Sequence, residues 1–537
     1  MRRMAGTVAV VMVLAAAWAA SASANPYTPN GTIVAESGFR PDANGYSFPN
    51  YGNENDPQNL DAASMIKLFG AGVCAGDVQD GTCTLTPGAR TWKEAQNKGM
   101  GGGHCEGFAI SSSLFYAGLG DPPTPTPFGA PTVPGLSLDG NKALQAQIAY
   151  TFVFQFLPAV STTKVNGSPT EVLAALSAAL PSKEPLVLGV YKRGFKGGHA
   201  ITPLAIEDRG EGKFAVLVYD NNFPNTIREV DIDQNANTWN YVASTNPSEP
   251  AAQYEGDASS KTLEVEYAKN GLGTQPCPFC GGGGGGRPTP RGLVSEGGQP
   301  AQLFWEGDPR DGQHSDVSIV DGDGNVAGIT GSGDDAEITS EIPGVDVVPS
   351  KLGGDQGVDV WNESAPPVFD LPQGLSFEVD LNGRELDGSA NEGFSLVRDG
   401  VTFTLDDLRL ESDDNQQVQI GDKNLAVENA ADHDVSPTMG YDDVEGGKGY
   451  EVTLRTSGLD ADSTLDLTAR PGQHRLKLEL DAGGDDDAKV TAVVSRTGAN
   501  GEAKKAKTRP TTIDAGEHGT ITYSDKALRD GKLELDS

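Results

Sequence analysis

Cys105 is the one cysteine of the chain that local spacing leaves without a partner. The sequence has five cysteines, and closely spaced cysteines of an exported protein usually form disulfides. Spacing pairs Cys74 with Cys83 and Cys277 with Cys280. We therefore expect Cys105 to be a free thiol, the form in which a cysteine can act as a nucleophile.

The residues around Cys105 suit a nucleophilic thiol. Residues 91–98 are expected to form a helix, which the glycines at 99 and 101–103 end. Cys105 then begins a second, apolar helix that runs to about Ala117. The positive end of a helix dipole favours a thiolate at that position. The glycines also let backbone N–H groups approach a substrate carbonyl, as an oxyanion hole requires.

A nucleophilic cysteine needs a base that a third group holds in place, and a later hairpin offers both. Two β-rich runs, HAITPLAIED and KFAVLVYDNN, flank the turn-forming residues RGEG. If the hairpin is centred on the first two residues of that turn, His199 falls opposite Asp220 or Asn221. Opposed side chains share a face, so Asp220 can hold one imidazole nitrogen while the other faces the cysteine. Asn221 or Asn222 would serve if the register slips, because the face alternates with every residue.

The segments GGGHCEGFA, GGHAITPLAIED and VLVYDNNFP span about 120 residues, and their order resembles that of papain-like and transglutaminase-like cysteine enzymes. The resemblance implies an α+β domain in which the cysteine begins a core helix, the histidine begins a strand and the acid or amide lies on the adjoining strand. It implies Cys105 as the nucleophile, His199 as the base and Asp220 as the residue that orients the base. Papain-like enzymes place an oxyanion-hole glutamine a few residues before the cysteine, whereas Gln96 lies nine residues before Cys105 with four glycines between.

Structural roles remain open for these residues. A single cysteine among apolar residues is often an inert core thiol, and a lone histidine is often structural. We expect His104 to make local hydrogen bonds, with a catalytic or metal-binding role as the alternative. Gln96 is either a helix-surface residue or an oxyanion donor. Full burial of Cys105, or a position out of reach of His199, would favour a noncatalytic protein.

The sequence thus predicts a secreted cysteine-dependent hydrolase, a peptidase that acts on a protein or peptide through a thioacyl-enzyme and needs no cofactor. One alternative is transglutaminase-type acyl transfer, in which the same residues pass the acyl group to an amine. Another is a noncatalytic cell-envelope or adhesion protein that uses a papain-like domain as a scaffold.

The chain divides into five parts. Residues 1–24 are a signal peptide, because two arginines and an apolar run precede small residues at the cleavage spacing, and no later stretch is long and apolar enough to span a bilayer. Residues 25–273 form the papain-like or transglutaminase-like α+β domain. Residues 274–292 form a Cys-, Gly- and Pro-rich linker with six consecutive glycines. Residues 293–436 and 437–537 alternate apolar and polar residues between turn signals, which predicts two all-β, sandwich-like domains.

Cys277 and Cys280 of the predicted linker could have more than one role. Polyglycine follows Cys277 and Cys280, where a thioredoxin-type motif would need a helix. We therefore expect a small disulfide loop. A redox site, or a four-cysteine zinc site completed by Cys74 and Cys83, is the alternative.

The acidity of the chain limits its partners. The formal net charge is −35, and residues 291–537 hold 50 acidic against 21 basic residues. Nucleic acid and anionic membranes repel such a polyanion. We expect a solvated acidic surface, with calcium binding by some carboxylates as the alternative, and C-terminal domains that either attach to a cell-surface polymer or act as spacers. Asp321, Asp323 and Asn325 resemble the start of a calcium loop, but its required glycine is missing, so we expect a hairpin turn.

Overall fold

A computed structural model describes most of the chain after the predicted signal peptide, and residues 1–24 lie outside the described residues. The described residues are 27–243, 252–280, 299–305, 314–352, 366–412, 414–428, 434–443, 448–459, 463–470, 475–481, 488–498, 502–514, 516–531 and 533–536. The chain is mostly β, with 41% strand and 24% helix. Within the described ranges, no helix has the length and apolar character needed to cross a membrane.

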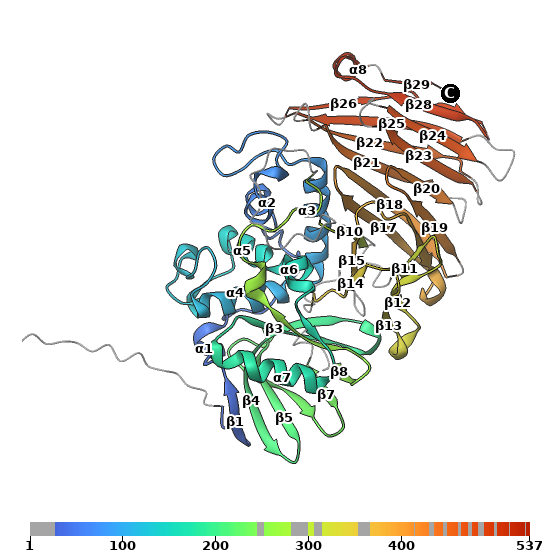
Figure 1. Ribbon diagram of the computed structural model, residues 1–537. Coiled ribbons are helices and arrows are strands. Elements are labelled where there is room, and N and C mark those ends of the chain that lie inside the picture. The colour runs from blue at the N-terminus through green and yellow to red at the C-terminus, as the bar shows by residue number, and fades with distance from the viewer. Residues whose placement is uncertain are drawn as a thin grey trace, which may run out of the picture.

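The N-terminal part packs helices against one antiparallel sheet (Figure 1). Its helices are α1 (Pro41–Asn44), α2 (Ala62–Phe69), α3 (Pro87–Gly99), α4 (Cys105–Ala117), α5 (Lys142–Phe152), α6 (Pro158–Ser161) and α7 (Pro169–Ala179). Its strands are β1 (Thr32–Glu36), β2 (Val165–Asn166), β3 (Leu186–Tyr191), β4 (Gly198–Gly210), β5 (Lys213–Tyr219), β6 (Ile227–Asp233), β7 (Thr238–Ala243), β8 (Ala252–Asp257) and β9 (Leu263–Tyr267). The sheet order is β2-β9-β3-β4-β5-β6-β7-β8, and β1 also pairs with β4.

Helix α4 lies at the centre of the N-terminal part and begins at Cys105, where the sequence predicts a helix start. All its residues up to Phe115 are buried, because apolar and small side chains occur on every side of the helix. The helix ends at Gly118, whose left-handed φ of 66° favours glycine. Gly107 allows a close approach of α5, since a Cβ there would lie 2.2 Å from the carbonyl oxygen of Ile148. Helix α4 therefore packs between α5 and strands β3 and β4.

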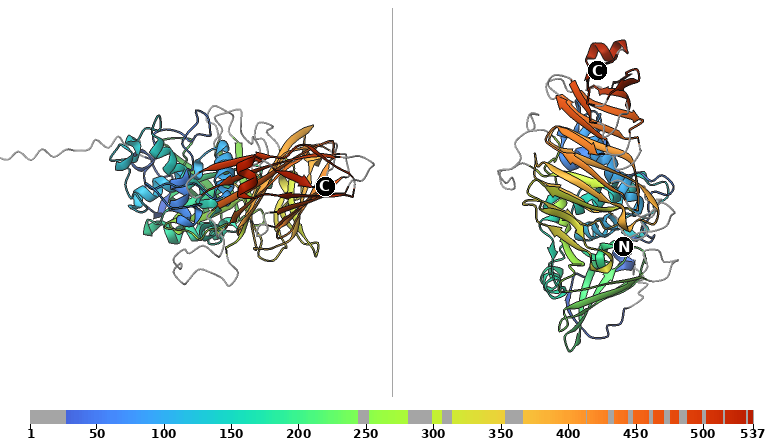
Figure 2. Two further views of the ribbon diagram at one scale, coloured as in Figure 1. Left: turned by 90° about the horizontal axis from the view of Figure 1, so that it is seen from above. Right: turned by 90° about the vertical axis from the view of Figure 1, so that its right-hand side faces the viewer.

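The C-terminal part consists of two ten-stranded antiparallel sheets that share one hydrophobic core (Figures 1 and 2). One sheet has the order β14-β15-β10-β17-β18-β21-β22-β25-β26 with β27 beside β25, and the other has the order β13-β12-β11-β16-β19-β20-β23-β24-β28-β29. The strands are β10 (Ala301–Trp305), β11 (Asp316–Asp321), β12 (Val326–Thr330), β13 (Glu337–Ser340), β14 (Asp346–Val348), β15 (Val368–Leu371), β16 (Phe377–Asn382), β17 (Ser389–Arg398), β18 (Val401–Glu411), β19 (Asn415–Ile420), β20 (Asn424–Glu428), β21 (Ser436–Asp443), β22 (Lys448–Ser457), β23 (Thr464–Arg470), β24 (Arg475–Asp481), β25 (Ala488–Thr497), β26 (Ala503–Lys507), β27 (Thr511–Ile513), β28 (His518–Thr522) and β29 (Glu534–Asp536), and a short helix, α8 (Asp525–Asp530), precedes the last of them.

The predicted division of this region at residues 436 and 437 is wrong. Strand β18 pairs with β21, which begins at the predicted boundary, and β20 pairs with β23. Strands from 293–436 and from 437–537 therefore belong to the same two sheets and bury the same core. An alternating pattern marks each strand, but it does not reveal which strands become neighbours. The predicted hairpin turn after β11 is confirmed, because β11 pairs with β12 and the Asp321 carboxylate accepts from the backbone N–H groups of Asp323 and Asn325.

The predicted linker begins later than expected. Residues 274–280 pack against the N-terminal part, and Phe279 is buried with its ring centroid 5.5 Å from that of Phe69. Phe279 also lies 6.3 Å from Trp92 between ring centroids, so it belongs to the aromatic core of the N-terminal part. Both predicted pairs, Cys74–Cys83 and Cys277–Cys280, are disulfides. Of the rest of the predicted linker, residues 281–292 lie outside the described residues.

The N-terminal and C-terminal parts share a continuous interface (Figures 1 and 2). Helix α3 packs against β17, β18 and β21. Trp92 of α3 donates from Nε1 to Gln302 Oε1 at 2.7 Å, and Gln302 Nε2 donates to the carbonyl oxygen of Phe156 at 2.8 Å. Apolar residues of β10, β14, β15 and β17 belong to the same core cluster as Cys105. The C-terminal part thus completes the core in which the candidate site lies.

Candidate active site

Cys105, His199 and Asp220 meet in the buried centre of the N-terminal part. Cys105 begins α4, His199 is the second residue of β4, and Asp220 directly follows β5. His199 Nε2 lies 2.8 Å from Asp220 Oδ1, and none of the three residues is more than 1% exposed. The backbone N–H of Ala200 donates to Cys105 Sγ at 3.4 Å, so the start of α4 lies directly against β4. Three residues that are far apart in the sequence are therefore close together in space.

The hairpin of β4 and β5 differs in register from the predicted one. Its turn lies at residues 211–212, two residues later than predicted, and two irregularities shift the pairing along the ladder. The last pair of the ladder is Thr202 with Tyr219, and one further residue reaches Asp220. That position shares a face with His199 and is diagonal to it instead of directly opposite. The predicted register is wrong because bulges leave no mark in the turn residues.

The surroundings of His199 favour its protonated form. Burial alone would lower the pKa of His199, but the charge and hydrogen bond of Asp220, together with the Cys105 side chain, raise it to about 10. Burial would raise the pKa of Asp220, yet His199, Tyr241 and a backbone N–H lower it. Tyr241 Oη donates to Asp220 Oδ2 at 2.5 Å, and the N–H of Asn222 donates to Oδ1 at 2.9 Å. His199 Nδ1 makes no hydrogen bond to any residue in the described ranges, which leaves it available to the adjacent thiol.

We expect the Asp220→Ala variant to lower the pKa of His199 from about 10 to 6.5 or below. Burial lowers this pKa, and the variant removes the Asp220 carboxylate that raises it. A pKa raised in the folded state means that the native protein binds the proton more tightly than the unfolded chain does. This contribution to stability is present below pH 6.5 and is lost as the pH rises through about 10. Imidazole NMR titration, with His199 assigned through a His199→Gln variant, measures the pKa. An unchanged value in Asp220→Ala would contradict the assigned contact.

Both ring nitrogens of His104 are hydrogen-bonded, to residues 53 and 45 positions earlier in the sequence. Its Nδ1 lies 2.7 Å from the carbonyl oxygen of Tyr51, and its Nε2 lies 2.9 Å from Asn59 Oδ1. Burial lowers the pKa of His104 to about 4, although the bond to Tyr51 opposes this change. Both ring nitrogens are therefore occupied away from the thiol, and the ring is neutral at physiological pH.

The remaining predicted candidates take different positions. Asn221 Nδ2 donates to the carbonyl oxygens of Cys105 at 3.2 Å and of Ala200 at 2.8 Å, so it ties the start of α4 to β4. Asn222 contacts Asp220 through its backbone. Gln96 is buried on α3, so the expectation of a helix-surface residue is wrong, and its Nε2 has no hydrogen-bond partner among the described residues. Among the described residues, the hydrogen bonds of Cys105 Sγ go to Ala200 and Lys351 and not to Gln96.

A segment of the C-terminal part, Val348–Leu352, enters the candidate site, and no prediction from the sequence anticipates it. The carbonyl oxygen of Lys351 lies 3.5 Å from Cys105 Sγ. The Lys351 N–H donates to Gln155 Oε1 at 2.9 Å, and Gln155 Nε2 lies 3.5 Å from the Lys351 carbonyl oxygen. Gln155, and not Gln96, is thus the glutamine whose amide faces a carbonyl group beside the thiol.

Glycines before Cys105 and before His199 make room for this segment. A Cβ on Gly102 would lie 2.5 Å from the Leu352 side chain, and one on Gly198 would lie 2.5 Å from the carbonyl oxygen of Ser350. Any larger residue at either position would collide with Val348–Leu352. The glycines before Cys105 and before His199 therefore border the segment Val348–Leu352 directly.

The Lys351 side chain ends in a cluster of buried carboxylates. Its Nζ lies 2.7 Å from Glu266 Oε1, 3.0 Å from Glu264 Oε1 and 4.0 Å from Glu106 Oε2, and all four side chains are fully buried. Lys164 Nζ lies 3.0 Å from the other oxygen of Glu264. The two glutamates of β9 alternate with apolar residues that are buried as well, so this strand is covered on both faces. The pattern LEVEY is typical of a half-exposed strand, so the sequence does not predict that these glutamates are buried.

The charges of this cluster balance. Burial raises the pKa of Glu106 well above its ordinary range, and the neighbouring Glu266 adds to that effect, which favours the neutral form of Glu106. Burial also opposes the charged forms of Glu264 and Lys351. However, the charges of Lys164 and Lys351 lower the pKa of Glu264, and the charges of the two β9 glutamates raise that of Lys351. Two cations therefore face two carboxylates, and loss of Lys351 alone would leave one buried negative charge.

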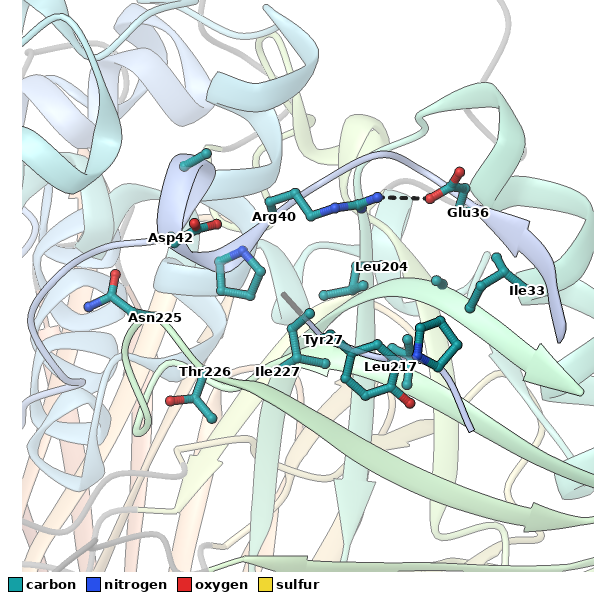
Figure 3. A pocket seen from close by; sticks show the side chains of 14 residues that line it. Tyr27, Ile33, Glu36, Arg40, Asp42, Leu204, Leu217, Asn225, Thr226 and Ile227 are labelled. Carbon is teal, nitrogen blue, oxygen red and sulfur yellow. Dashed lines mark hydrogen bonds and ion pairs between the residues drawn. The ribbon is translucent and has the colours of Figure 1, made fainter. Parts of the chain in front are cut away.

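A separate cavity of about 650 Å³ lies near the start of the described chain (Figure 3). Side chains of Ile33, Leu204 and Leu217 line it, and an ion pair of Arg40 with Glu36 crosses its edge at 3.0 Å. None of the three residues that meet at the thiol lines this cavity. Within the described ranges, no three or more His, Cys, Asp or Glu side chains are grouped in a way that would hold a metal ion.

Comparison with known proteins leaves the site to be judged by its own geometry. No protein-family model, curated protein or solved structure matches this chain.

Proposed function

We propose that the protein is a secreted cysteine-dependent hydrolase that cleaves amide bonds of a protein or peptide, with a papain-like or transglutaminase-like N-terminal domain. The single observation that carries this proposal is a free thiol, Cys105, at the strand residue next to His199, a histidine that a buried aspartate orients. A base that a third group orients is what activates a cysteine nucleophile, and the second nitrogen of His199 has no other partner among the described residues. The two disulfides agree with an oxidising, extracellular compartment.

The proposed reaction has two halves, formation of a thioester on Cys105 and its hydrolysis, and His199 transfers protons in both. His199 takes the thiol proton of Cys105, Sγ attacks the substrate carbonyl carbon, the C–N bond breaks, and His199 passes that proton to the leaving amine. Water then attacks the thioester, His199 takes a proton from that water, and the carboxylic acid leaves. Asp220 holds His199 throughout and stabilises its charged form. Backbone N–H groups at the start of α4 and the Gln155 side chain would stabilise the oxyanion.

Full burial of Cys105 is the observation that favours a noncatalytic scaffold. The burial comes in part from Val348–Leu352, a segment whose Lys351 backbone contacts both Cys105 Sγ and Gln155. Burial of this kind differs from burial of a core thiol by surrounding side chains. Burial of the thiol by such a segment is therefore weaker evidence against an enzyme than equal burial by core side chains would be.

Product analysis tests the proposal. The protein is incubated with a peptide library in the presence and absence of a labelled primary amine, and the products are identified by mass spectrometry. We expect free carboxylic acids, and we expect no product from protein alkylated beforehand at its free thiol. Incorporation of the amine in place of water would indicate the transglutaminase-type alternative. Equal turnover by the alkylated protein would rule out a role for Cys105, and absence of any product from both the wild-type chain and its Lys351→Met variant would favour a scaffold.

A further inference from the structure

The segment Val348–Leu352 lies in the candidate site in the manner of a bound peptide. Its residue Lys351 presents both backbone groups to the amide of Gln155, and its carbonyl oxygen lies 3.5 Å from Cys105 Sγ. A substrate residue on the acyl side of the attacked bond must place its carbonyl group beside the nucleophile in this way. The position of Lys351 therefore corresponds to that residue.

The side chain of Lys351 occupies a pocket that suits a lysine. Its Nζ has carboxylate oxygens of Glu266 and Glu264 at 2.7 and 3.0 Å, and the Tyr191 hydroxyl at 3.5 Å. Tyr191 Oη in turn donates to Glu264 at 2.8 Å, which fixes the pocket wall. A fully buried ammonium group needs this number of polar partners, because an unpaired charge in the interior is very costly.

The pocket belongs to the site and is not a remote ion-pair cluster. Glu106 follows Cys105 directly in the sequence, and Glu264 and Glu266 lie on β9, which pairs with β3 next to β4. Without Lys351, Lys164 would balance only one of the two charged glutamates. The empty pocket would therefore carry a net negative charge at a lysine's length from the nucleophile, and it would attract a cationic side chain.

We propose that Glu106, Tyr191, Glu264 and Glu266 form the subsite that recognises a lysine side chain on the acyl side of the attacked bond, and that Lys351 fills this subsite in cis, which makes the full chain a latent form. This inference rests on the proposed function. The chemical step is the one given above: the acyl group of the substrate lysine is transferred to Cys105 Sγ, the amine leaves with a proton from His199, and water releases the lysyl carboxylate.

The test uses the full chain and two peptide vinyl sulfones, acetyl-Pro-Ser-Lys and acetyl-Pro-Ser-norleucine, which copy residues 349–351 and differ only in the terminal ammonium group. Two variants are compared with the wild type. Lys351→Met removes the ammonium group from the subsite and nearly keeps the length of the side chain. Lys351→Met/Glu266→Gln also removes the unbalanced charge, so it is the matched control. Intact mass spectrometry follows modification of Cys105, and circular dichroism verifies folding.

We expect Lys351→Met to react with the lysine probe about tenfold faster than the wild type, since a difference of 1.4 kcal/mol corresponds to a factor of ten. In this variant the lysine probe should also react about tenfold faster than the norleucine probe, and the added Glu266→Gln change should remove most of that preference. Equal rates for the two probes in Lys351→Met would overturn the subsite. Equal rates in the wild type and in both variants would overturn the latency. If Lys351→Met does not fold, the charge-balanced double variant still tests the latency, and the ratio of probe rates in the wild type tests the subsite.

Hydrolysis of acetyl-Pro-Ser-Lys-Leu-amide by Lys351→Met separates this inference from the proposed function. A preference between the probes without hydrolysis would leave the subsite intact and overturn the hydrolase. Hydrolysis of the lysine and norleucine peptides at equal rates would leave the hydrolase intact and overturn the subsite.

Discussion

The Cys105→Ala variant is expected to lose all reaction with thiol electrophiles and to reduce peptide turnover by about 10³-fold or more. The other four cysteines are in disulfides, so one label per chain in the parent protein should fall to none. Turnover falls because a methyl group cannot form the thioester, and substrate binding and the oxyanion donors alone support little residual rate. The comparison is made in the Lys351→Met chain, in which the proposed subsite is open. Mass spectrometry counts the labels and peptide hydrolysis gives the rates.

Ser112→Ala is the matched control for this variant. Ser112 lies on the same helix, is fully buried like Cys105, and its hydroxyl donates only to the carbonyl oxygen of Ala109 at 3.3 Å. The variant removes one buried polar atom from α4 and leaves the thiol in place, so labelling and turnover should remain within about twofold of the parent. Turnover by Cys105→Ala at the rate of this control would exclude a thioester mechanism.

The elements that carry the candidate site could be predicted because short-range rules determine them. Glycines followed by an apolar run predict that α4 begins at Cys105, and the structure has this helix start. Two β-rich runs around a turn predict a hairpin, and any hairpin of β4 with β5 brings His199 near Asp220. The exact register could not be predicted. It depends on two irregularities that packing imposes on the strands.

Long-range features of the fold were hidden for a different reason. Lys351 contacts Glu266 and Glu106, which lie 85 and 245 residues earlier in the sequence. No local sequence pattern predicts contacts between residues so far apart. A lysine between proline, serine and glycine reads as a surface turn, and a glutamate that alternates with apolar residues reads as a half-exposed strand. Only the assembled fold shows that both are buried. The division at residue 436 failed similarly, because sheet neighbours are chosen by tertiary packing.

The buried cluster links stability to the proposed latency. The contacts that close the site, above all Lys351 with its two carboxylates, are also contacts between the C-terminal and N-terminal parts. A change that opens the site by removing the ammonium group should therefore weaken the whole chain. Charge balance inside the pocket should decide how large that effect is, which distinguishes this cluster from ion pairs at the surface.

We expect the Lys351→Met variant to lower the free energy of unfolding by about 3–5 kcal/mol, because it leaves a buried carboxylate without its partner. Adding Glu266→Gln should recover most of this loss, since Lys164 still balances Glu264 and the cluster is again neutral. Urea unfolding of the wild type, both single variants and the double variant gives the coupling energy, which we expect to be about 2 kcal/mol or more.

The exposed pair of Arg40 with Glu36 supplies the comparison, because Arg40→Met should cost about 1 kcal/mol or less in a group half open to water. If Lys351→Met were no more destabilising than Arg40→Met, or if Glu266→Gln made the loss larger, Lys351 would not be the counter-ion of this pocket. The wild-type chain would then hold Val348–Leu352 in the site by its backbone and apolar contacts alone.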